Sequence, residues 1–176
     1  MSMTIYSKST TKVLSQRRLE AFRNYARVVQ WGRRDPIAFT RRVLGIELLD
    51  YQKYTFMNTW TSSFAVWLDS RNAGKSAQAA IYTMARSLLF PNYTTYFVSN
   101  VGTQAKETFL KLEHIAKQEI SSFDGCTDVF INEVEISGNA GTGFVHDPAS
   151  FHTRVFNGSE ILTLNSDPTN VKGKRT

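Results

Sequence analysis

The chain has 176 residues, of which 41% are hydrophobic and 20% are charged, as in an ordinary globular protein with a single core. Its one cysteine excludes a disulfide framework and fits a reducing compartment, and its three histidines are not at metal-ligand spacing with that cysteine. The apolar runs are too short to span a bilayer and the N-terminus lacks a signal-peptide core, so we expect a cytoplasmic protein with no membrane partner.

The net charge of +6 is concentrated near the N-terminus. Residues 1–47 contain ten Lys or Arg against three acidic residues, whereas residues 48–176 contain eleven basic and twelve acidic residues. We therefore distinguish a basic N-terminal helical segment, 1–47, from the remainder, 48–176. Such a segment favours a polyanion, most simply nucleic acid, through Coulombic attraction and counterion release. The alternative is a solvated helix face. The candidate contacts are Arg23, Arg27, Arg33 and Arg34.

Three helices are predicted in the first third of the chain. The first runs from Lys12 to Trp31, and Gly32 ends it. Its predicted buried residues are Leu19, Phe22, Ala26 and Val29. The second begins at Asp35-Pro36, an N-cap followed by a proline at the first helical position, and Gly45 stops it. The third starts near Tyr51-Gln52 and continues to about Trp60.

The stretch from Phe64 to Ser76 carries the strongest functional signal. Five apolar residues, Phe64 to Leu68, predict a buried parallel strand, and an Ala-rich helix is predicted from Lys75 to Leu89. The sequence between them is Asp-Ser-Arg-Asn-Ala-Gly-Lys-Ser (69–76). Strand, loop ending in Gly-Lys-Ser and helix form the pattern of a phosphate-binding loop, although Asp69 replaces the usual first glycine.

The chemistry of such a loop assigns roles to its residues. Backbone N–H groups and the positive end of the helix dipole face the phosphates. The residues that would surround the nucleotide are Ser70, Arg71, Asn72, Ala73, Gly74, Lys75 and Ser76. Lys75 would reach the β- and γ-phosphates, and the hydroxyl of Ser76 would hold Mg²⁺. Gln52 can read adenine, because its amide offers both a donor and an acceptor, or it can be a solvated helix residue.

The remaining elements predict an α/β fold with a parallel sheet. A strand is expected at Thr94–Ser99 and an amphipathic helix at Gln104–Ile120, with its inward residues at Phe109, Leu112, Ile115 and Ala116. A further strand is expected at Asp128–Ile136, and the glycine-rich stretch 138–143 is interpreted as a flexible turn. Asn157-Gly158 predicts a hairpin between 151–156 and 160–164.

Hydrolysis also needs an acidic residue at the end of an apolar strand to hold Mg²⁺. The nearest candidate, Val129 to Glu133, has Asn132 where the metal-binding aspartate should stand. We expect that the chain ends before the acidic strand arrives, at the basic loop Val171–Arg175, so that the domain is incomplete.

Residues 70–76 resemble the variant phosphate-binding loop of the large terminase subunit of tailed bacteriophages, the DNA-packaging ATPase. In that family the first glycine of the loop is commonly replaced, as it is by Asp69 here. An arginine commonly lies within the loop, as Arg71 does here. The matching segments occur in the same order as in that family and extend over roughly residues 35–175. They include Asp35-Pro36, Tyr51-Gln52, Val98 to Lys106 and the basic loop Val171–Arg175.

The resemblance implies a P-loop NTPase sheet of the RecA type with an N-terminal helical segment and a β-hairpin insertion. The chain would be the first part of the ATPase domain, without the acidic strand and without the nuclease domain of the full protein. Cofactors would be ATP and Mg²⁺. Lys75 and Arg71 would be catalytic, Arg71 at the γ-phosphate, and Gln52 would contact adenine. For Arg71 the alternative is a structural ion pair.

The implied activity is ATP hydrolysis that drives double-stranded DNA into a procapsid. The implied partners are duplex DNA, the portal, the small terminase subunit and further copies in a ring, in the cytoplasm of an infected bacterium. Two alternatives stay open. One is a helicase-like motor with the same sheet, which a glycine at position 69 would have favoured. The other is a fragment that binds nucleotide or DNA without turnover.

Overall fold

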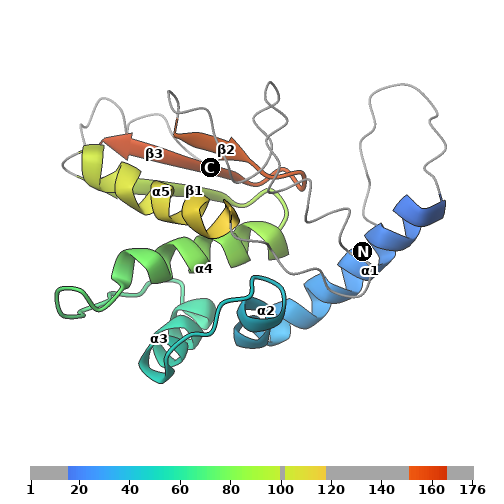
Figure 1. The fold of residues 1–176 in the computed structure, drawn as a ribbon, viewed down its shortest axis with the longest axis horizontal. Coiled ribbons are helices and arrows are strands. Elements are labelled where there is room, and N and C mark those ends of the chain that lie inside the picture. Colours follow the sequence, from blue (N-terminus) through green and yellow to red (C-terminus); the bar gives the residue numbers. More distant parts are fainter. Residues whose placement is uncertain (1–15, 100–101, 118–150, 166–176) are drawn as a thin grey trace.

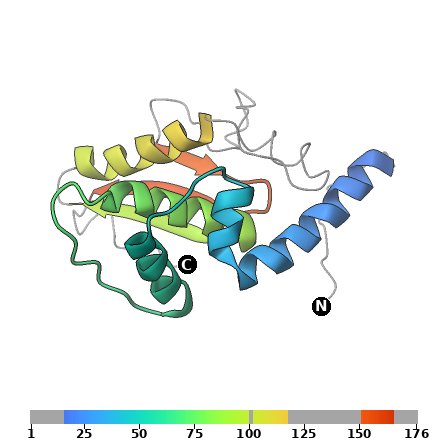
Figure 2. The same ribbon diagram turned by 60° about the horizontal axis from the view of Figure 1, so that its bottom comes forward.

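The computed structural model describes residues 16–99, 102–117 and 151–165, which form an α/β fold of five helices and a three-stranded mixed sheet. The helices are α1 (Gln16–Arg34), α2 (Pro36–Arg42), α3 (Asp50–Thr61), α4 (Lys75–Leu89) and α5 (Gly102–Lys117). The strands are β1 (Thr94–Ser99), β2 (His152–Arg154) and β3 (Glu160–Asn165). Helix α5 lies in front of the sheet in Figure 1 and α4 lies below it, packed against α5, while α1, α2 and α3 lie beyond α4 (Figure 1 and Figure 2).

The sheet has the order β1-β3-β2. β1 pairs with β3 in parallel, from Thr94 opposite Glu160 to Ser99 opposite Asn165, and β2 pairs with β3 in the antiparallel sense. The predicted strand 94–99 and the predicted hairpin around Asn157-Gly158 are therefore confirmed. Gly158 has φ +86°, and a Cβ at this position would come within 2.2 Å of Asn92 Oδ1, so the turn requires glycine.

The segment 64–68 differs from its prediction. It has no regular secondary structure: no backbone hydrogen bond joins it to any other described residue, and it belongs to no strand of the described sheet. Phe64 is 83% exposed, Val66 64% and Leu68 91%. The prediction of a buried parallel strand was wrong for this structure, because a strand forms only where a neighbour accepts its backbone hydrogen bonds.

Helix α1 also differs in its end and in its buried face. It continues through Gly32 to Arg34, because Gly32 lies against other helices: a Cβ there would be 2.8 Å from both Leu89 Cδ2 and Phe39 Cδ2. The buried residues are Ala21, Tyr25 and Val28, whereas Leu19 is 43% exposed. Ala26 is also exposed, and Phe22 and Val29 are partly buried. The predicted face is thus displaced around the helix.

The other helices follow their predictions. Asp35 caps α2, and its carboxylate accepts a hydrogen bond from the N–H of Ala38 (2.9 Å). α3 and α4 begin and end within two residues of the expected positions. In α5, Phe109, Leu112 and Ala116 are buried and Ile115 is partly buried. The predicted strand 128–136 and the turn 138–143 lie outside the described residues.

A single core joins the N-terminal helices to the rest. It includes Val28 from α1, Phe39 from α2, Phe56 from α3, Met84 from α4 and Ile161 from β3. Each large side chain of this kind contributes about 1.5–3 kcal/mol when buried. Among the helices that the structure describes, none is long and apolar enough to cross a membrane.

Candidate functional site

The loop that precedes α4 holds the residues to which the sequence assigns phosphate contacts. Gly74 is the N-cap of α4 with φ +80°, and Asn72 also has a positive φ of +69°. The N–H of Ala73 donates to the carbonyl of Ser70 (3.3 Å), which closes a turn, and the first helical bond runs from Gln78 to Gly74. No side chain caps the N-terminus of α4. The first N–H groups of the helix therefore keep their positive partial charge for a ligand.

Lys75, the first residue of α4, turns back over the loop. Its ammonium donates to the carbonyls of Asp69 (2.6 Å) and Ser70 (2.7 Å). Ser76 follows in the first turn and is partly buried. A phosphate oxygen forms a stronger, charge-assisted bond to an ammonium than a neutral carbonyl does.

Helix α3 places Tyr51 and Gln52 against the same loop. The hydroxyl of Tyr51 donates to the carbonyl of Ala73 (3.0 Å), and Gln52 Nε2 donates to that hydroxyl (3.4 Å). A Cβ built on Gly74 would lie 3.3 Å from Gln52 Nε2. The structure thus brings Gln52 close to Gly74 of the predicted phosphate-binding loop, although these two residues are more than 20 positions apart in sequence.

The amide of Gln52 also has a structural task. Its Oε1 accepts a hydrogen bond from the N–H of Leu49 (3.0 Å), which satisfies one of the free donors at the start of α3. Gln52 is partly buried and hydrogen-bonded through both amide atoms, so it is more than a solvated helix residue. Its contact with adenine stays a prediction.

Two polar residues of this region were missed in the sequence. Tyr51 fixes the loop through Ala73, and its adjacency to Gln52 was the available signal. Gln78 is 1% exposed; its Nε2 donates to the carbonyl of Gln52 (2.9 Å), and its Oε1 has no partner among the described residues. A glutamine on the buried face of an Ala-rich helix, four residues after Gly74, was the signal for it. Together Tyr51 and Gln78 tie α3 to the loop and to α4.

Arg71 and Asp69 lie on either side of Ser70. Arg71 is exposed and forms no ion pair with any residue that the structure describes, so nothing there supports the structural ion pair considered above. Its action at a γ-phosphate stays a prediction. Asp69 contributes its backbone carbonyl to Lys75, while its Oδ2 is buried without a partner in the described part of the chain. Asp69 therefore braces the loop through its backbone.

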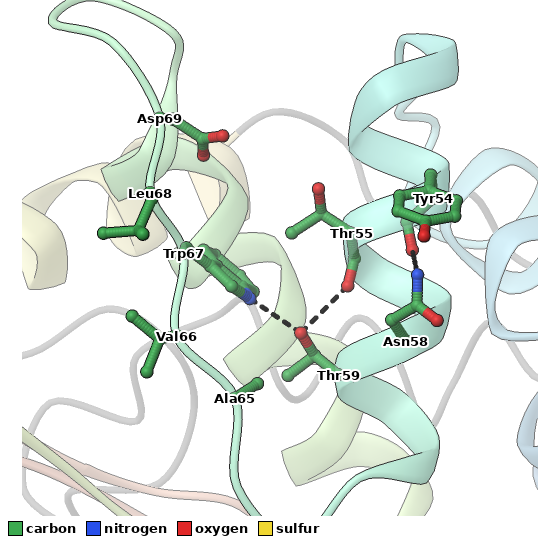
Figure 3. Close-up of a pocket in the computed structure, with 9 residues that line it drawn as sticks. All are labelled: Tyr54, Thr55, Asn58, Thr59, Ala65, Val66, Trp67, Leu68 and Asp69. Atoms are coloured by element: carbon green, nitrogen blue, oxygen red, sulfur yellow. Dashed lines mark hydrogen bonds between the residues drawn. The ribbon is translucent and has the colours of Figure 1, made fainter.

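An open pocket of about 190 Å³ lies between α3 and the segment that leads into the loop (Figure 3). Trp67 points toward α3 and donates from Nε1 to the hydroxyl of Thr59 (2.7 Å), whereas Val66 and Leu68 point away from it. Trp67 thus anchors the segment to α3, whereas the side that carries Val66 and Leu68 faces away from α3. The residues that line the pocket are Tyr54, Thr55, Asn58, Thr59, Ala65, Val66, Trp67, Leu68 and Asp69.

The N-terminal arginines separate into two groups. Arg23, Arg27 and Arg34 are exposed. Intervals of four and eleven residues bring them within about 40° of one another around a helix and spread them over about 16 Å of its length. The packed residues Ala21, Tyr25, Val28 and Gly32 lie on the opposite side. We call Arg23, Arg27 and Arg34 the α1 stripe.

Arg33 is exposed as well, but its side chain also contacts α4 and the residue that follows it. Its Nε donates to the carbonyl of Leu89 (2.7 Å), and its guanidinium lies 4.7 Å from the ring centre of Phe90. The Arg33 carbonyl accepts a hydrogen bond from Trp60 Nε1 (3.2 Å). These contacts hold α1 against α3 and α4, and the nucleic-acid contact of Arg33 stays a prediction.

Metal-binding groups are limited in the described ranges. Residues 16–99, 102–117 and 151–165 contain no cluster of three or more His, Cys, Asp or Glu side chains that could hold a metal ion. Asn132 and Glu133, the nearest approach to an acidic strand end, lie outside these ranges.

The comparisons with known proteins leave the site to be interpreted on its geometry. The sequence matches no protein-family model, and no curated protein or solved structure is significantly similar to it.

Proposed function

We propose that residues 70–76 and the start of α4 bind ATP with Mg²⁺, as the nucleotide site of a P-loop motor. One observation carries the proposal: the uncapped N-terminus of α4 follows a glycine with positive φ, and the Lys75 ammonium lies on the loop carbonyls. Backbone donors, helix dipole and lysine then act on the same anion. Tyr51 and Gln52, which hold the loop from α3, support this proposal.

In this proposal each residue has a defined task. Lys75 neutralises the β- and γ-phosphates, Arg71 reaches the γ-phosphate from its exposed position, and Gln52 contacts the adenine edge. The backbone of 70–74 surrounds the phosphates. Mg²⁺ would supply charge neutralisation between the phosphate oxygens, and Ser76 is the residue that would hold it. A single hydroxyl would leave most of the ligands of this ion to phosphate and water.

We further propose that the motor acts on double-stranded DNA, as a terminase large subunit does when it fills a procapsid in an infected bacterium, with ring assembly, portal and small subunit as partners. The α1 stripe supports a polyanionic partner. Its three arginines lie on one exposed face, and about 16 Å is a span over which an extended basic surface can contact several phosphates of a duplex.

The nucleotide site is tested by replacing Lys75 with alanine. The charge-assisted contacts of an ammonium are worth about 1.5–3 kcal/mol, so we expect Lys75→Ala to weaken Mg·ATP binding by about ten- to 150-fold in calorimetric titration. Lys111→Ala, an exposed lysine on α5, is the matched control and should bind as the parent does. Equal affinity of Lys75→Ala and parent would refute the site.

The DNA partner is tested by the salt dependence of duplex binding, measured without nucleotide. Each phosphate contact contributes about 0.9 to the slope of log K against log[salt], so Arg23→Gln with Arg27→Gln should lower that slope by about 2. The control pair, Lys111→Gln with Lys117→Gln, removes the same charge from α5. If both pairs change the slope equally, net charge and not the α1 stripe determines binding.

A further inference from the structure

Four side-chain donors hold the C-terminal end of α4. The last carbonyls of a helix have no intrahelical partner and need donors from elsewhere. Here each of four successive carbonyls, from Ser87 to Phe90, has one. Asn157 Nδ2 donates to Ser87 (2.7 Å), the Tyr25 hydroxyl to Leu88, Arg33 Nε to Leu89 (2.7 Å) and the Ser159 hydroxyl to Phe90 (2.8 Å). We call these four donors the α4 clamp.

The clamp joins elements that are far apart in the chain. Tyr25 and Arg33 belong to α1, and Asn157 and Ser159 belong to the turn between β2 and β3. Tyr25 and Arg33, which are about two helical turns apart in α1, therefore both donate hydrogen bonds to the same end of α4. A displacement of that end would therefore act on α1 directly, through these two hydrogen bonds.

The middle of α4 is too tightly packed to absorb such a displacement. Ala80, Met84 and Ala85 are fully buried and Leu88 is 1% exposed. Interiors packed at crystal-like density transmit strain rather than dissipating it. With 15 residues, α4 extends over about 22 Å and behaves as a rod between its two ends.

Lys75 braces the opposite end of α4. In this structure the Lys75 ammonium is bonded to the carbonyls of Asp69 and Ser70. A bound phosphate takes that ammonium, which frees both carbonyls and removes the brace between the loop and the first turn of α4. The hydrogen bonds at the start of α4 would therefore change when a phosphate binds.

We propose that α4 transmits the occupancy of the phosphate loop to α1 through the α4 clamp. The packed side of α1 receives the movement, and its exposed side carries the α1 stripe, so nucleotide and polyanion become linked ligands. Linkage is reciprocal: a nucleotide that changes the affinity for DNA has its own affinity changed by the same factor. This inference rests on the proposed nucleotide site.

Amide hydrogen exchange, measured by mass spectrometry on the full chain with and without Mg²⁺ and a non-hydrolysable ATP analogue, separates the two ideas. Slower exchange in residues 70–80 reports nucleotide binding, and a change in residues 25–34 reports transmission. In the parent we expect both, with exchange at α1 changed by about five- to tenfold, the lower range of allosteric couplings. Tyr25→Phe and Arg33→Gln should keep the loop response and lose most of the α1 response.

Arg41→Gln is the control, because Arg41 is exposed on α2 and pairs with Glu47 rather than with α4. It should retain both responses. Protection of the loop with no change in α1 of the parent overturns the transmission and leaves the nucleotide site standing. An α1 response that survives in both clamp variants overturns the clamp as its route. No protection of the loop overturns the nucleotide site and the transmission with it. Tyr25→Phe keeps the ring, and circular dichroism confirms that each variant is folded.

Discussion

Replacing Gly74 with alanine tests the loop geometry and the proposed function together. Gly74 has φ +80°, a conformation that costs an L-residue with a Cβ about 1–2 kcal/mol. Alanine also lowers the entropy of the unfolded chain, which returns about 0.4–1 kcal/mol. The new Cβ would lie 3.3 Å from Gln52 Nε2, the end of a flexible side chain that can move by a few tenths of an ångström. We therefore expect a net loss of about 1 kcal/mol in the free energy of unfolding.

Gly45 offers a matched control, since its φ is +69° and it lies after α2 rather than in the loop. Urea denaturation should show a similar loss for Gly45→Ala and Gly74→Ala. Only Gly74→Ala should weaken Mg·ATP binding, because its Cβ displaces the Gln52 amide and changes the direction of the first N–H groups of α4. Unchanged or increased stability of Gly74→Ala would refute the positive φ, and equal binding by both variants would refute the role of this glycine in the site.

Three further predictions concern the fold, each measured by urea denaturation. Gly32→Ala should destabilise by about 1 kcal/mol, because overpacking against Leu89 and Phe39 outweighs the gain in helix propensity; a more stable variant would contradict the packing. Leu68→Ser should change stability by less than about 0.5 kcal/mol, since Leu68 is 91% exposed; a loss of about 2 kcal/mol or more would mean that it is buried. Asn157→Ala should cost about 1–3 kcal/mol, more than Asn58→Ala, which removes one bond within α3; equal costs would argue against the α4 clamp.

Elements with strong local signals could be predicted from the sequence. The Ala-rich helix α4, the β-branched and aromatic strand β1 and the Asn157-Gly158 hairpin are specified by residues adjacent in the chain. The segment 64–68 shows the limit of such signals. Five apolar residues indicate an affinity for burial, but strand formation depends on neighbours elsewhere in the chain, and local sequence contains no information about their position.

The prediction of the buried face of α1 was wrong for a different reason. Leu19, the most apolar choice, is exposed, while Tyr25 is 6% exposed because its hydroxyl finds the carbonyl of Leu88. Hydropathy ranks tyrosine below leucine in its tendency to be buried. It contains no information about a hydrogen-bond acceptor elsewhere in the chain, such as the carbonyl of Leu88. Gly32 was interpreted as a stop signal, whereas the structure uses its missing side chain for close packing. Either role suits glycine, and only the partner helices decide between them.

The candidate site could be predicted where it follows a contiguous motif. Helix α4 begins at Lys75 as predicted, and Gln52 lies beside the loop that precedes it, whereas the strand predicted to lead into that loop is not formed. The contacts of Tyr51 with Ala73 and of Gln78 with Gln52 could not be foreseen, because each joins residues more than 20 positions apart through the crossing of two helices. Crossing geometry depends on all the side chains between the helices and not on a motif.

The α4 clamp has a consequence for synthesis of the chain on the ribosome. Tyr25 and Arg33 precede α4 and are present when it emerges, but Asn157 follows Ser87 by 70 residues and Ser159 follows Phe90 by 69. The ribosome adds about 5–20 residues per second, so the carbonyls of Ser87 and Phe90 lack these donors for about 4–14 s. During that interval α1 alone secures the end of the helix. A variant that weakens Tyr25 or Arg33 would then expose the nascent chain to misfolding and degradation before the hairpin arrives, and its yield in cells would fall by more than its equilibrium stability indicates.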